Sequence, residues 1–514
     1  YDVCDLVNDP NADYEAILRT DTDKGAGSVH SATTVKLSTS RFRKSSWTYD
    51  GTNPVTNGEV AGGVSRRDGH TAEGNTLTIA STATTGLNAA YGGKAEAASD
   101  VRDNRVVVEG TGSGTIVNAI GGATAKAGGV AEKNHVLIKG GTVTNAMGGF
   151  VSGANASATG NEVTVEGGTV ANVIGAGGAG GTGNIANNFV TIKGGTVTGQ
   201  IVGGYTHELT SSSNGNTVTL GGGTLTGAEV WGSSYVNAIN QASVLGSSDA
   251  QIAGNTLNVA AKNLEVKKVR NFEKYTFTPT DAVQNSDTML TLSAAGGFGG
   301  ISGTSDDVKV KWSNVTADTS ALTALSTGIQ GKNTITLLKT GDGAADLHFD
   351  GYAATAKADG TYETLLHTAG NAADTAALLL DVNRYRDSHV TTDQDADSDL
   401  YGGYSASDHS DDGGTTIGHT ATGNTLSVTK IANGSNINAY GGYAGGTAGG
   451  AENNELTVNV TAPTAGKINN AYGGYTKGAG AVTGNKLTFS QGTVLHDLIG
   501  GYADSTTSAA EVTG

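Results

Sequence analysis

The sequence is poor in several residue types, and each shortage excludes a class of protein. Cys4 is the single cysteine, which excludes an internal disulfide framework and a multi-cysteine zinc site. The four prolines among 514 residues are too few for a proline-rich disordered linker. The sequence has no run of about eighteen or more apolar residues, so we expect no segment to cross a membrane as a helix.

Charged residues are also scarce, at 15% of the chain, and they are unbalanced. The 48 acidic and 31 basic side chains give a formal net charge of −17, which disfavours a nucleic-acid partner through long-range repulsion. The sequence has no nucleophile elbow, phosphate loop or zinc-helix motif, and its ten histidines show no close metal-ligand spacing. We therefore predict no catalytic residue, no enzyme activity and no bound cofactor.

Glycine, by contrast, is abundant, with 80 residues that punctuate a repeated pattern. In residues 188–205, apolar and polar side chains alternate over 189–193, and a glycine pair at 194–195 interrupts the alternation. A second alternation over 196–202 ends at the glycine pair 203–204. The pattern predicts a strand, a corner, a second strand and a second corner, which is typical of one coil of a solenoid.

An asparagine starts each copy of the pattern, and the copies recur at a nearly constant distance. In a first block the separations are 29, 30, 27, 27, 28 and 39 residues, between Asn75, Asn104, Asn134, Asn161, Asn188, Asn216 and Asn255. In a second block they are 30 and 31 residues, between Asn424, Asn454 and Asn485. We expect equivalent amides of successive coils to form a hydrogen-bonded ladder, with the segments of variable length on one edge.

These repeats predict an all-β fold, an elongated parallel β-helix (β-solenoid) with roughly 27–31-residue coils. The inward side chains should be the alternate apolar ones, because neighbouring coils must bury them together. In three successive coils they are Val136, Ile138, Val143, Val163, Val165, Val170, Val190, Ile192 and Val197.

The pattern divides the chain into four parts. Residues 1–58 lack the repeat, and we expect them to form an N-terminal cap or atypical first coils that cover an open strand edge. Residues 59–256 and 401–514 are regular β-solenoid, whereas residues 257–400 are degenerate coils or an inserted β element. Within that part, the Ala- and Leu-rich residues 371–386 fit a helix, a strand or a loop. The chain starts without a methionine, which favours a processed or trimmed segment.

One acidic cluster is the candidate metal site. It consists of alternate aspartates, Asp393, Asp395, Asp397 and Asp399. Carboxylates at this spacing could serve one Ca²⁺ ion, which takes many oxygen ligands. The sixth place of the loop holds Ser398 instead of glycine, and Tyr404 stands where a bidentate glutamate belongs. A solvated acidic loop is therefore the favoured interpretation, and Ca²⁺ binding is the alternative.

Tyrosines form a second candidate feature, because they recur at equivalent corners of the second block. They are Tyr401, Tyr404, Tyr440, Tyr443, Tyr472 and Tyr475. Stacked in columns, their rings would stabilise the rod by aromatic packing, and we favour this structural role. Exposed in a row, the same rings would instead offer a platform for sugar rings.

The pattern GN-x-V-T-I-x-GGTV-x-x-x-x-GGY resembles the β-solenoid passengers of large bacterial autotransporter adhesins, which belong to the type V secretion class. The resemblance covers most of the chain from about Val60. It implies export to the extracellular face of the bacterial surface, with host or bacterial cell-surface glycans or proteins as partners. The family's signal peptide and C-terminal membrane barrel are not in this sequence, so contact with the outer membrane is implied by the resemblance alone.

Three functions are compatible with these features. The favoured one is a non-catalytic adhesin passenger, a stiff rod that displays variable edge loops for attachment. The first alternative is a self-assembling surface filament or layer, whose subunits associate end to end by strand pairing. The second alternative is a carbohydrate-active β-helix enzyme, which needs carboxylates converging in one groove, whereas the regular coils mostly carry Thr, Ser and Ala.

Overall fold

The computed structural model divides the chain into two compact units. Unit 1 comprises Tyr1–Thr278, Leu290–Thr316 and Thr340–Asp350, and unit 2 comprises Pro279–Met289, Ala317–Lys339 and Gly351–Gly514. The structure describes residues 4–7, 12–20, 35–52, 55, 57–83, 86–180, 183–208, 211–236, 242–243, 248–280, 283, 285–301, 309–320, 331–352, 355–392, 395–406, 409–410, 416–461, 466–505 and 512–513.

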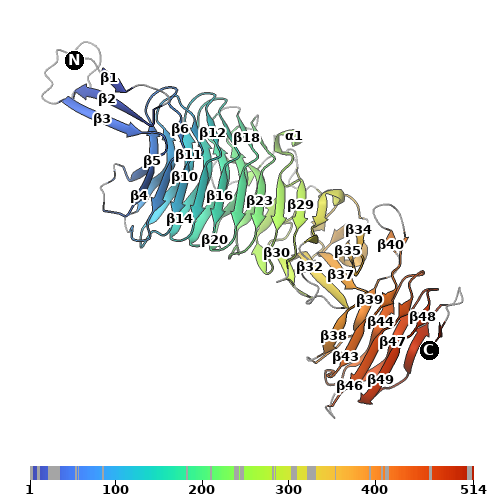
Figure 1. Cartoon of the computed structure of the whole chain (residues 1–514). Coiled ribbons are helices and arrows are strands. Elements are labelled where there is room, and N and C mark those ends of the chain that lie inside the picture. Colours follow the sequence, from blue (N-terminus) through green and yellow to red (C-terminus); the bar gives the residue numbers. More distant parts are fainter. Residues whose placement is uncertain are drawn as a thin grey trace. The chain divides into compact units, whose positions relative to one another are not determined.

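Unit 1 contains three sheets whose strands stack coil on coil (Figure 1). The first sheet is parallel and contains, in order, β4 (Ser46–Tyr49), β7 (Thr76–Ile79), β10 (Arg105–Val108), β13 (His135–Ile138), β16 (Glu162–Val165), β19 (Phe189–Ile192), β23 (Thr217–Leu220), β26 (Thr256–Val259), β29 (Lys274–Phe277) and β31 (Val315–Ala317). The third sheet contains β6 (Ala72–Glu73), β9 (Val101–Arg102), β12 (Val130–Glu132), β15 (Ser157–Thr159), β18 (Asn184–Ala186) and β22 (Ser212–Asn214).

The second sheet of unit 1 has the longest strands and carries the candidate site. Its strands are β5 (Glu59–Ser65), β8 (Leu87–Ala95), β11 (Thr115–Thr124), β14 (Thr142–Val151), β17 (Thr169–Gly178), β21 (Gln200–Thr206), β24 (Glu229–Val236) and β25 (Ala242–Ser243), with β20 (Thr196–Val197) beside β17 and β28 (Lys268–Arg270) beside β24. All these pairings are parallel except that of β24 with β25. A short helix, α1 (Asp249–Ile252), lies between β25 and β26 in the sequence.

Unit 2 repeats the three-sheet arrangement with fewer coils. Its parallel sheets are β38 (His389–Thr392), β43 (Thr425–Val428), β46 (Glu455–Asn459) and β49 (Lys486–Gln491); β39 (Leu400–Ser405), β44 (Asn436–Ala444), β47 (Lys467–Thr476) and β50 (Leu498–Ala503); and β42 (Ala421–Thr422), β45 (Ala451–Glu452), β48 (Val482–Thr483) and β51 (Val512–Thr513). The chain as a whole makes about 13 turns of roughly 29 residues, with almost no helix, which confirms the predicted β-solenoid.

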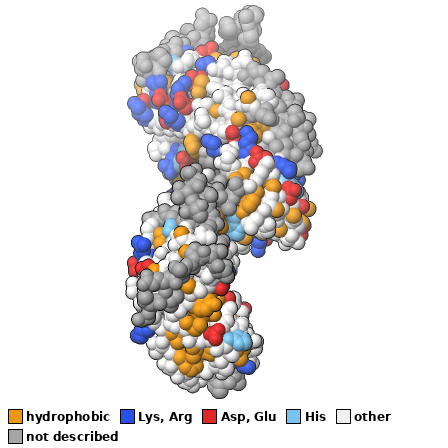
Figure 2. All heavy atoms as spheres, turned by 90° about the vertical axis from the view of Figure 1, so that its right-hand side faces the viewer, with side chains coloured by type: hydrophobic (Ala, Val, Ile, Leu, Met, Phe, Trp, Pro, Cys, Tyr) orange, Lys and Arg blue, Asp and Glu red, His pale blue; other side chains and the backbone are white. Residues whose placement is uncertain are grey.

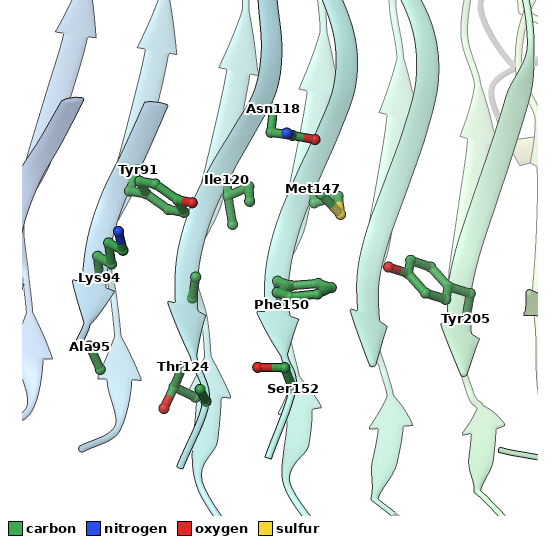
Figure 3. A pocket seen from close by; sticks show the side chains of 12 residues that line it. Tyr91, Lys94, Ala95, Asn118, Ile120, Thr124, Met147, Phe150, Ser152 and Tyr205 are labelled. Carbon is green, nitrogen blue, oxygen red and sulfur yellow. The ribbon is translucent and has the colours of Figure 1, made fainter. Parts of the chain in front are cut away.

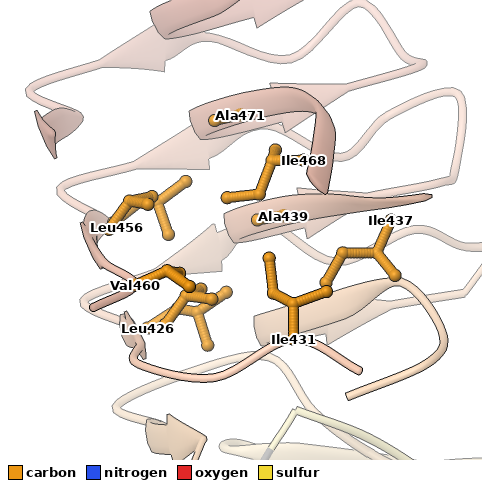
Figure 4. Packing of buried hydrophobic residues seen from close by; sticks show 10 residues of the cluster. Leu426, Ile431, Ile437, Ala439, Leu456, Val460, Ile468 and Ala471 are labelled. Carbon is orange, nitrogen blue, oxygen red and sulfur yellow. The ribbon is translucent and has the colours of Figure 1, made fainter. Parts of the chain in front are cut away.

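Aliphatic side chains fill the interior of both units. The nine inward positions predicted for three coils of unit 1 are at most 1% exposed, as expected for alternate apolar residues of stacked strands. In unit 2, the interior cluster includes Leu426, Leu456, Ile437 and Ile468, which come from successive coils (Figure 4). Each such side chain contributes roughly 1.5–3 kcal/mol of transfer free energy. Burial of these columns is therefore the main stabilising term of each coil.

The asparagine ladder is present in both units, and its amides are almost completely buried except that of Asn485, which is partly buried. In unit 1, Asn161 donates from Nδ2 to Asn188 Oδ1 at 3.0 Å and to the Ala131 carbonyl at 2.9 Å. Its own Oδ1 accepts from the backbone N–H and the Nδ2 of Asn134, both at 3.0 Å. The same pattern links Asn424, Asn454 and Asn485 in unit 2. Each amide thus satisfies backbone groups at a corner where the strands stop pairing.

The prediction that both glycine pairs are corners is right for the first pair and wrong for the second. Gly195 has a φ of +74° and lies at the turn after β19, a conformation that favours glycine. Gly203 and Gly204 instead lie inside β21, and the pairs of the YGGY sequences lie inside β39, β44 and β47. A Cβ on Gly149, the second glycine of an equivalent pair, would come within 2.6 Å of Asn161 Cγ. The second pair is needed because the ladder amide occupies the space of a side chain.

Residues 257–400 contain strands of two kinds. In unit 1, β26, β29 and β31 extend the first sheet, and β27 (Leu264–Val266) pairs in parallel with β30 (Thr288–Leu292). In unit 2, β32 (Lys332–Thr340), β37 (Ala377–Arg384), β35 (Tyr362–Thr368) and β34 (Thr355–Asp359) form an antiparallel sheet. Of the three conformations considered for residues 371–386, the structure shows mainly strand, with β36 (Asp374–Thr375) and β37. The four-part division itself stays a prediction.

Both units begin with an antiparallel cap, and the two caps have related sequences. In unit 1 the cap is β1 (Cys4–Val7), β2 (Tyr14–Thr20) and β3 (Val35–Arg41). In unit 2 the cap is the antiparallel sheet of β32, β37, β35 and β34. Three matched segments connect unit 1 with unit 2: YEAILRT at 14–20 with YETLLHT at 362–368, RFRKS at 41–45 with RYRDS at 384–388, and GHTAEGN at 69–75 with GHTATGN at 418–424. The chain is therefore a tandem of two units that start in the same way.

A buried glutamate joins each cap to its solenoid. Glu15 is 1% exposed, accepts from the Arg66 N–H at 2.8 Å and lies 3.1 Å from His70 Nδ1. The His70 ring stacks on Phe42 at 4.8 Å. Paired and hydrogen-bonded in this way, the carboxylate is tolerated in the interior.

The second cap repeats this arrangement. Glu363 is 1% exposed and accepts from the Ala406 N–H, and its Oε2 lies 3.7 Å from His419 Nε2. The His419 ring stacks on Tyr385 at 4.3 Å. Because the same contacts recur, the matched segments reflect a shared structure and not a chance similarity of sequence.

Candidate functional site

The glycine pairs inside the long strands, with Gly175-Ala176 in β17 and Gly232-Ser233 in β24 at the same place, separate two rows of side chains on the outside of unit 1. The residues before the pairs align in register as Ala61, Tyr91, Ile120, Met147, Ile174, Val202 and Trp231. The residues after the pairs align as Val64, Lys94, Ala123, Phe150, Gly177, Tyr205 and Ser234. We call these rows the first and second columns, and together the paired columns. Apolar side chains of both rows pack in a cluster separate from the interior ones.

Unit 2 has the same paired columns, but they are made almost entirely of tyrosine. Its first column is Tyr401, Tyr440, Tyr472 and Ile499, and its second is Tyr404, Tyr443, Tyr475 and Tyr502. Rings of Tyr401 and Tyr440 stack at 5.1 Å with 5° between their planes, and rings of Tyr443 and Tyr475 stack at 5.3 Å with 3°. Across the glycine pair, the rings of Tyr440 and Tyr443 meet edge to face at 5.2 Å.

This stacking decides between the two roles considered for the tyrosines. A sugar platform needs exposed ring faces, whereas within these columns the faces lie against the rings of the next coil. Tyr440, Tyr472 and Tyr475 are at most 9% exposed. The columns therefore form the structural ladder, and an open ring face is expected where a column begins. Figure 2 shows hydrophobic side chains gathered over unit 2, where Leu498 and Tyr502 of β50 are among the exposed ones.

The tyrosine ladder predicts a loss of stability in alkali. Burial raises the pKa of Tyr401, Tyr404 and Tyr440 above the ordinary value of about 10, because it disfavours the phenolate. The raised pKa means that these phenols contribute stability that is fully present below pH 10 and is lost as pH rises through the folded pKa. We expect phenolate absorbance to appear together with unfolding of unit 2, and Tyr440→Phe to move that transition to higher pH. Tyr14→Phe, at an exposed position, is the control; an identical shift in both variants would contradict the prediction.

In unit 1 the paired columns are interrupted by small residues, and this leaves a hollow of about 380 Å³. Tyr91, Ile120 and Met147 lie along one side of it, and Lys94, Phe150 and Tyr205 along the other (Figure 3). The register places Ala123 between Lys94 and Phe150. The hollow is therefore apolar in its walls, with Lys94 as a charged group at one end.

The far end of this hollow is closed by Tyr205. A Cβ on Gly177 would lie 2.2 Å from Tyr205 Cε1, so the tyrosine ring lies across the glycine and its hydroxyl points towards Phe150 (Figure 3). Burial raises the pKa of Tyr205 to about 12, because it disfavours the phenolate. The alternation of large and small side chains thus shapes the outer surface of the coils.

The predicted metal site is only partly described by the structure. Asp393 lies outside the described residues, whereas Asp395, Asp397 and Asp399 are exposed. Asp399 accepts from the backbone N–H of Asn438 at 2.7 Å, so one of its oxygens already has a partner. Among the described residues, no group of three or more His, Cys, Asp or Glu side chains is placed to hold a metal ion. Ca²⁺ binding at the aspartate cluster stays a prediction.

The paired columns of unit 1 were not anticipated from the sequence. The available signal was the bulky residue on one or both sides of many glycine pairs, as in Met147-Gly-Gly-Phe150 and Ile201-Val202-Gly-Gly-Tyr205. This signal predicts a side-chain column, but it cannot show that the column lies outside the core.

Comparison of the chain with protein-family models, with curated proteins and with solved structures found no match. The chain is a β-solenoid repeat protein on the evidence of its own structure. In the part of the chain that the structure describes, no helix is long and apolar enough to span a membrane.

Proposed function

We propose that the chain is the passenger of a bacterial autotransporter adhesin, exported to the cell surface, where it binds host or bacterial surface glycans or proteins without catalysis. The paired columns carry this proposal. The solenoid buries its aliphatic side chains inside, and the paired columns add a second apolar cluster on the outer face, beside a hollow of about 380 Å³ lined by Tyr91, Ile120 and Phe150. An apolar hollow at the surface is typical of a binding site. The resemblance of the repeat to autotransporter passengers supports the export and the location.

Competition with whole cells tests this function. We expect the soluble chain to block attachment of bacteria that display it, and to bind a subset of a glycan and cell-surface protein array. Phe150→Asp, which puts a charge into the paired columns, should weaken this binding at least about tenfold, because an unpaired carboxylate is costly in an apolar contact. The matched control is Phe189→Asp at an exposed position of the first sheet, where the ring is 44% exposed.

Four results would count against the proposal. The absence of competition at saturating protein, or equal loss in both aspartate variants, would remove the paired columns as the binding surface. New reducing ends or unsaturated products from a polysaccharide panel would favour an enzyme, and regular end-to-end fibres in electron microscopy would favour a filament subunit.

A further inference from the structure

A hollow recurs at the same place in both units, beside the first coil of each solenoid. The first coils align as EVAGGVS at 59–65 with DLYGGYS at 399–405. In unit 1 the hollow has about 430 Å³ and in unit 2 about 460 Å³. Equivalent residues line both: Glu59 corresponds to Asp399, and Ala61 to Tyr401. The hollows lie beside the strands in which the columns begin.

In unit 1, the rim of this hollow carries opposite charges that balance. Lys94 Nζ lies 2.7 Å from Glu59 Oε2 and 5.0 Å from the centre of the Tyr91 ring. A second pair joins Arg66 Nε to Glu96 Oε2 at 3.1 Å. The two carboxylates and two cations leave no net charge for an ionic ligand to neutralise. Between them lies the apolar surface of Ala61 and its neighbours in the first strand.

The hollow of unit 2 reproduces this chemistry with different residues. Lys332 Nζ lies 5.9 Å from the Tyr401 ring centre and 5.0 Å from that of Tyr404. Asp399 supplies the carboxylate, and Ser398 an exposed hydroxyl beside it. One face of Tyr401 stacks on Tyr440, and among the described residues no ring stacks on the other face, where Lys332 lies instead. A tyrosine ring, an ammonium group and a carboxylate therefore meet at both places.

We propose that each hollow binds one ring of a neutral carbohydrate, so that the chain has two sugar sites. A pyranose has apolar C–H faces and a rim of hydroxyl groups, which fit an aromatic surface bordered by donors and acceptors. An anionic ligand would face Glu59 or Asp399, and a cationic one Lys94 or Lys332. An apolar peptide side chain would desolvate these charges without giving them hydrogen bonds. This proposal rests on the proposed function and names the ligand class.

Two equivalent sites on one chain raise the affinity of the protein for a surface that displays many copies of the sugar. A single shallow sugar site binds weakly, whereas a second site linked to the first binds at a high effective concentration. We therefore expect weak binding to free oligosaccharides and much stronger binding to surfaces that display many copies of them.

Titration of the full chain with soluble glycans tests the number of sites. The probes are linear hexasaccharides of β-1,4-linked glucose and of β-1,4-linked N-acetylglucosamine, with a sulfated heparin hexasaccharide as the anionic comparison. We expect a neutral probe to bind with two sites per chain and the sulfated probe to bind at least about tenfold more weakly. Ala61→Trp fills the hollow of unit 1 and Ser398→Trp that of unit 2, so each should reduce the number of sites to one, and the double variant to none.

Val117→Trp is the matched control, since it adds the same ring at an exposed position of unit 1 outside the hollow. Circular dichroism and thermal unfolding should be unchanged in all four variants. Binding of neither neutral probe, tighter binding of the sulfated probe, or two remaining sites in the double variant would overturn the proposal. If the double variant still blocks bacterial attachment, the sugar sites are wrong while the adhesin function stands.

Discussion

Replacement of Asn161 by alanine is expected to lower the free energy of unfolding of unit 1 by about 4 kcal/mol. The side-chain amide is fully buried and takes part in four hydrogen bonds, with the Asn134 N–H and Nδ2, the Ala131 carbonyl and Asn188 Oδ1. Alanine would remove all four bonds in the interior, where each polar group left unsatisfied costs roughly 1–3 kcal/mol. The loss falls in the middle of the stack, where it also weakens the coupling between neighbouring coils.

Chemical denaturation and amide hydrogen exchange measure this effect. Exchange should speed up first in β13, β16 and β19, which flank the missing amide. Asn88→Ala is the control, because Asn88 is exposed and donates one hydrogen bond from its side chain, to the Asn57 carbonyl at 2.7 Å. A loss of less than about 1 kcal/mol in Asn161→Ala, or equal losses in both variants, would show that the ladder is not a major source of stability.

Replacement of Gly149 by alanine should lower the free energy of unfolding of unit 1 by about 3 kcal/mol, although the substitution adds only a methyl group. The added Cβ would lie 2.6 Å from both Cγ and Nδ2 of Asn161 and 2.7 Å from its Oδ1. Either the amide must move, which breaks its hydrogen bonds, or the strand must shift out of register with its neighbours. Overpacking of this kind typically costs 1–3 kcal/mol before any hydrogen bond is lost.

The matched control for this prediction is Gly86→Ala. Gly86 is exposed, and a Cβ there would meet Thr115 O at an ordinary contact distance of 3.5 Å. Thermal unfolding of the two variants should differ clearly, with Gly86→Ala close to the parent chain. Similar midpoints for both would mean that the strand tolerates a side chain next to the ladder.

Much of the fold could be predicted because its local pattern and its packing agree. The spacing of Asn134, Asn161 and Asn188 gives the length of a coil, and the alternation of Val163 and Val165 gives the inward face. Both signals come from one coil and are repeated by the next, so an error in a single copy has little effect. The ladder follows because amides at a fixed place in stacked coils must meet.

The parts that could not be predicted depend on contacts between coils. Gly195 is needed because the backbone there has a positive φ, whereas Gly204 is needed because Asn216 and Ser213 occupy the space that a Cβ would fill. The sequence does not distinguish these two reasons for a glycine. The sequence predicts degenerate coils or an inserted β element for residues 257–400, and it does not reveal the second cap because Glu363 and His419 lie far apart in sequence. The matched segments relate these two residues to Glu15 and His70, but the sequence does not show that both glutamates are buried next to the histidines.

The asparagine ladder also has a direction. From Asn75 to Asn216, every amide donates from Nδ2 to the Oδ1 of the following coil, and none of these bonds runs backwards. The amide dipoles therefore add head to tail and polarise one another along the stack. The two ends of such a row are chemically different, since at one end Asn75 Oδ1 accepts from the Ser45 N–H and at the other Asn255 Nδ2 donates to the Ser213 and Ile252 carbonyls. A further coil can join the row in only one orientation, so the ladder fixes the direction in which the solenoid assembles.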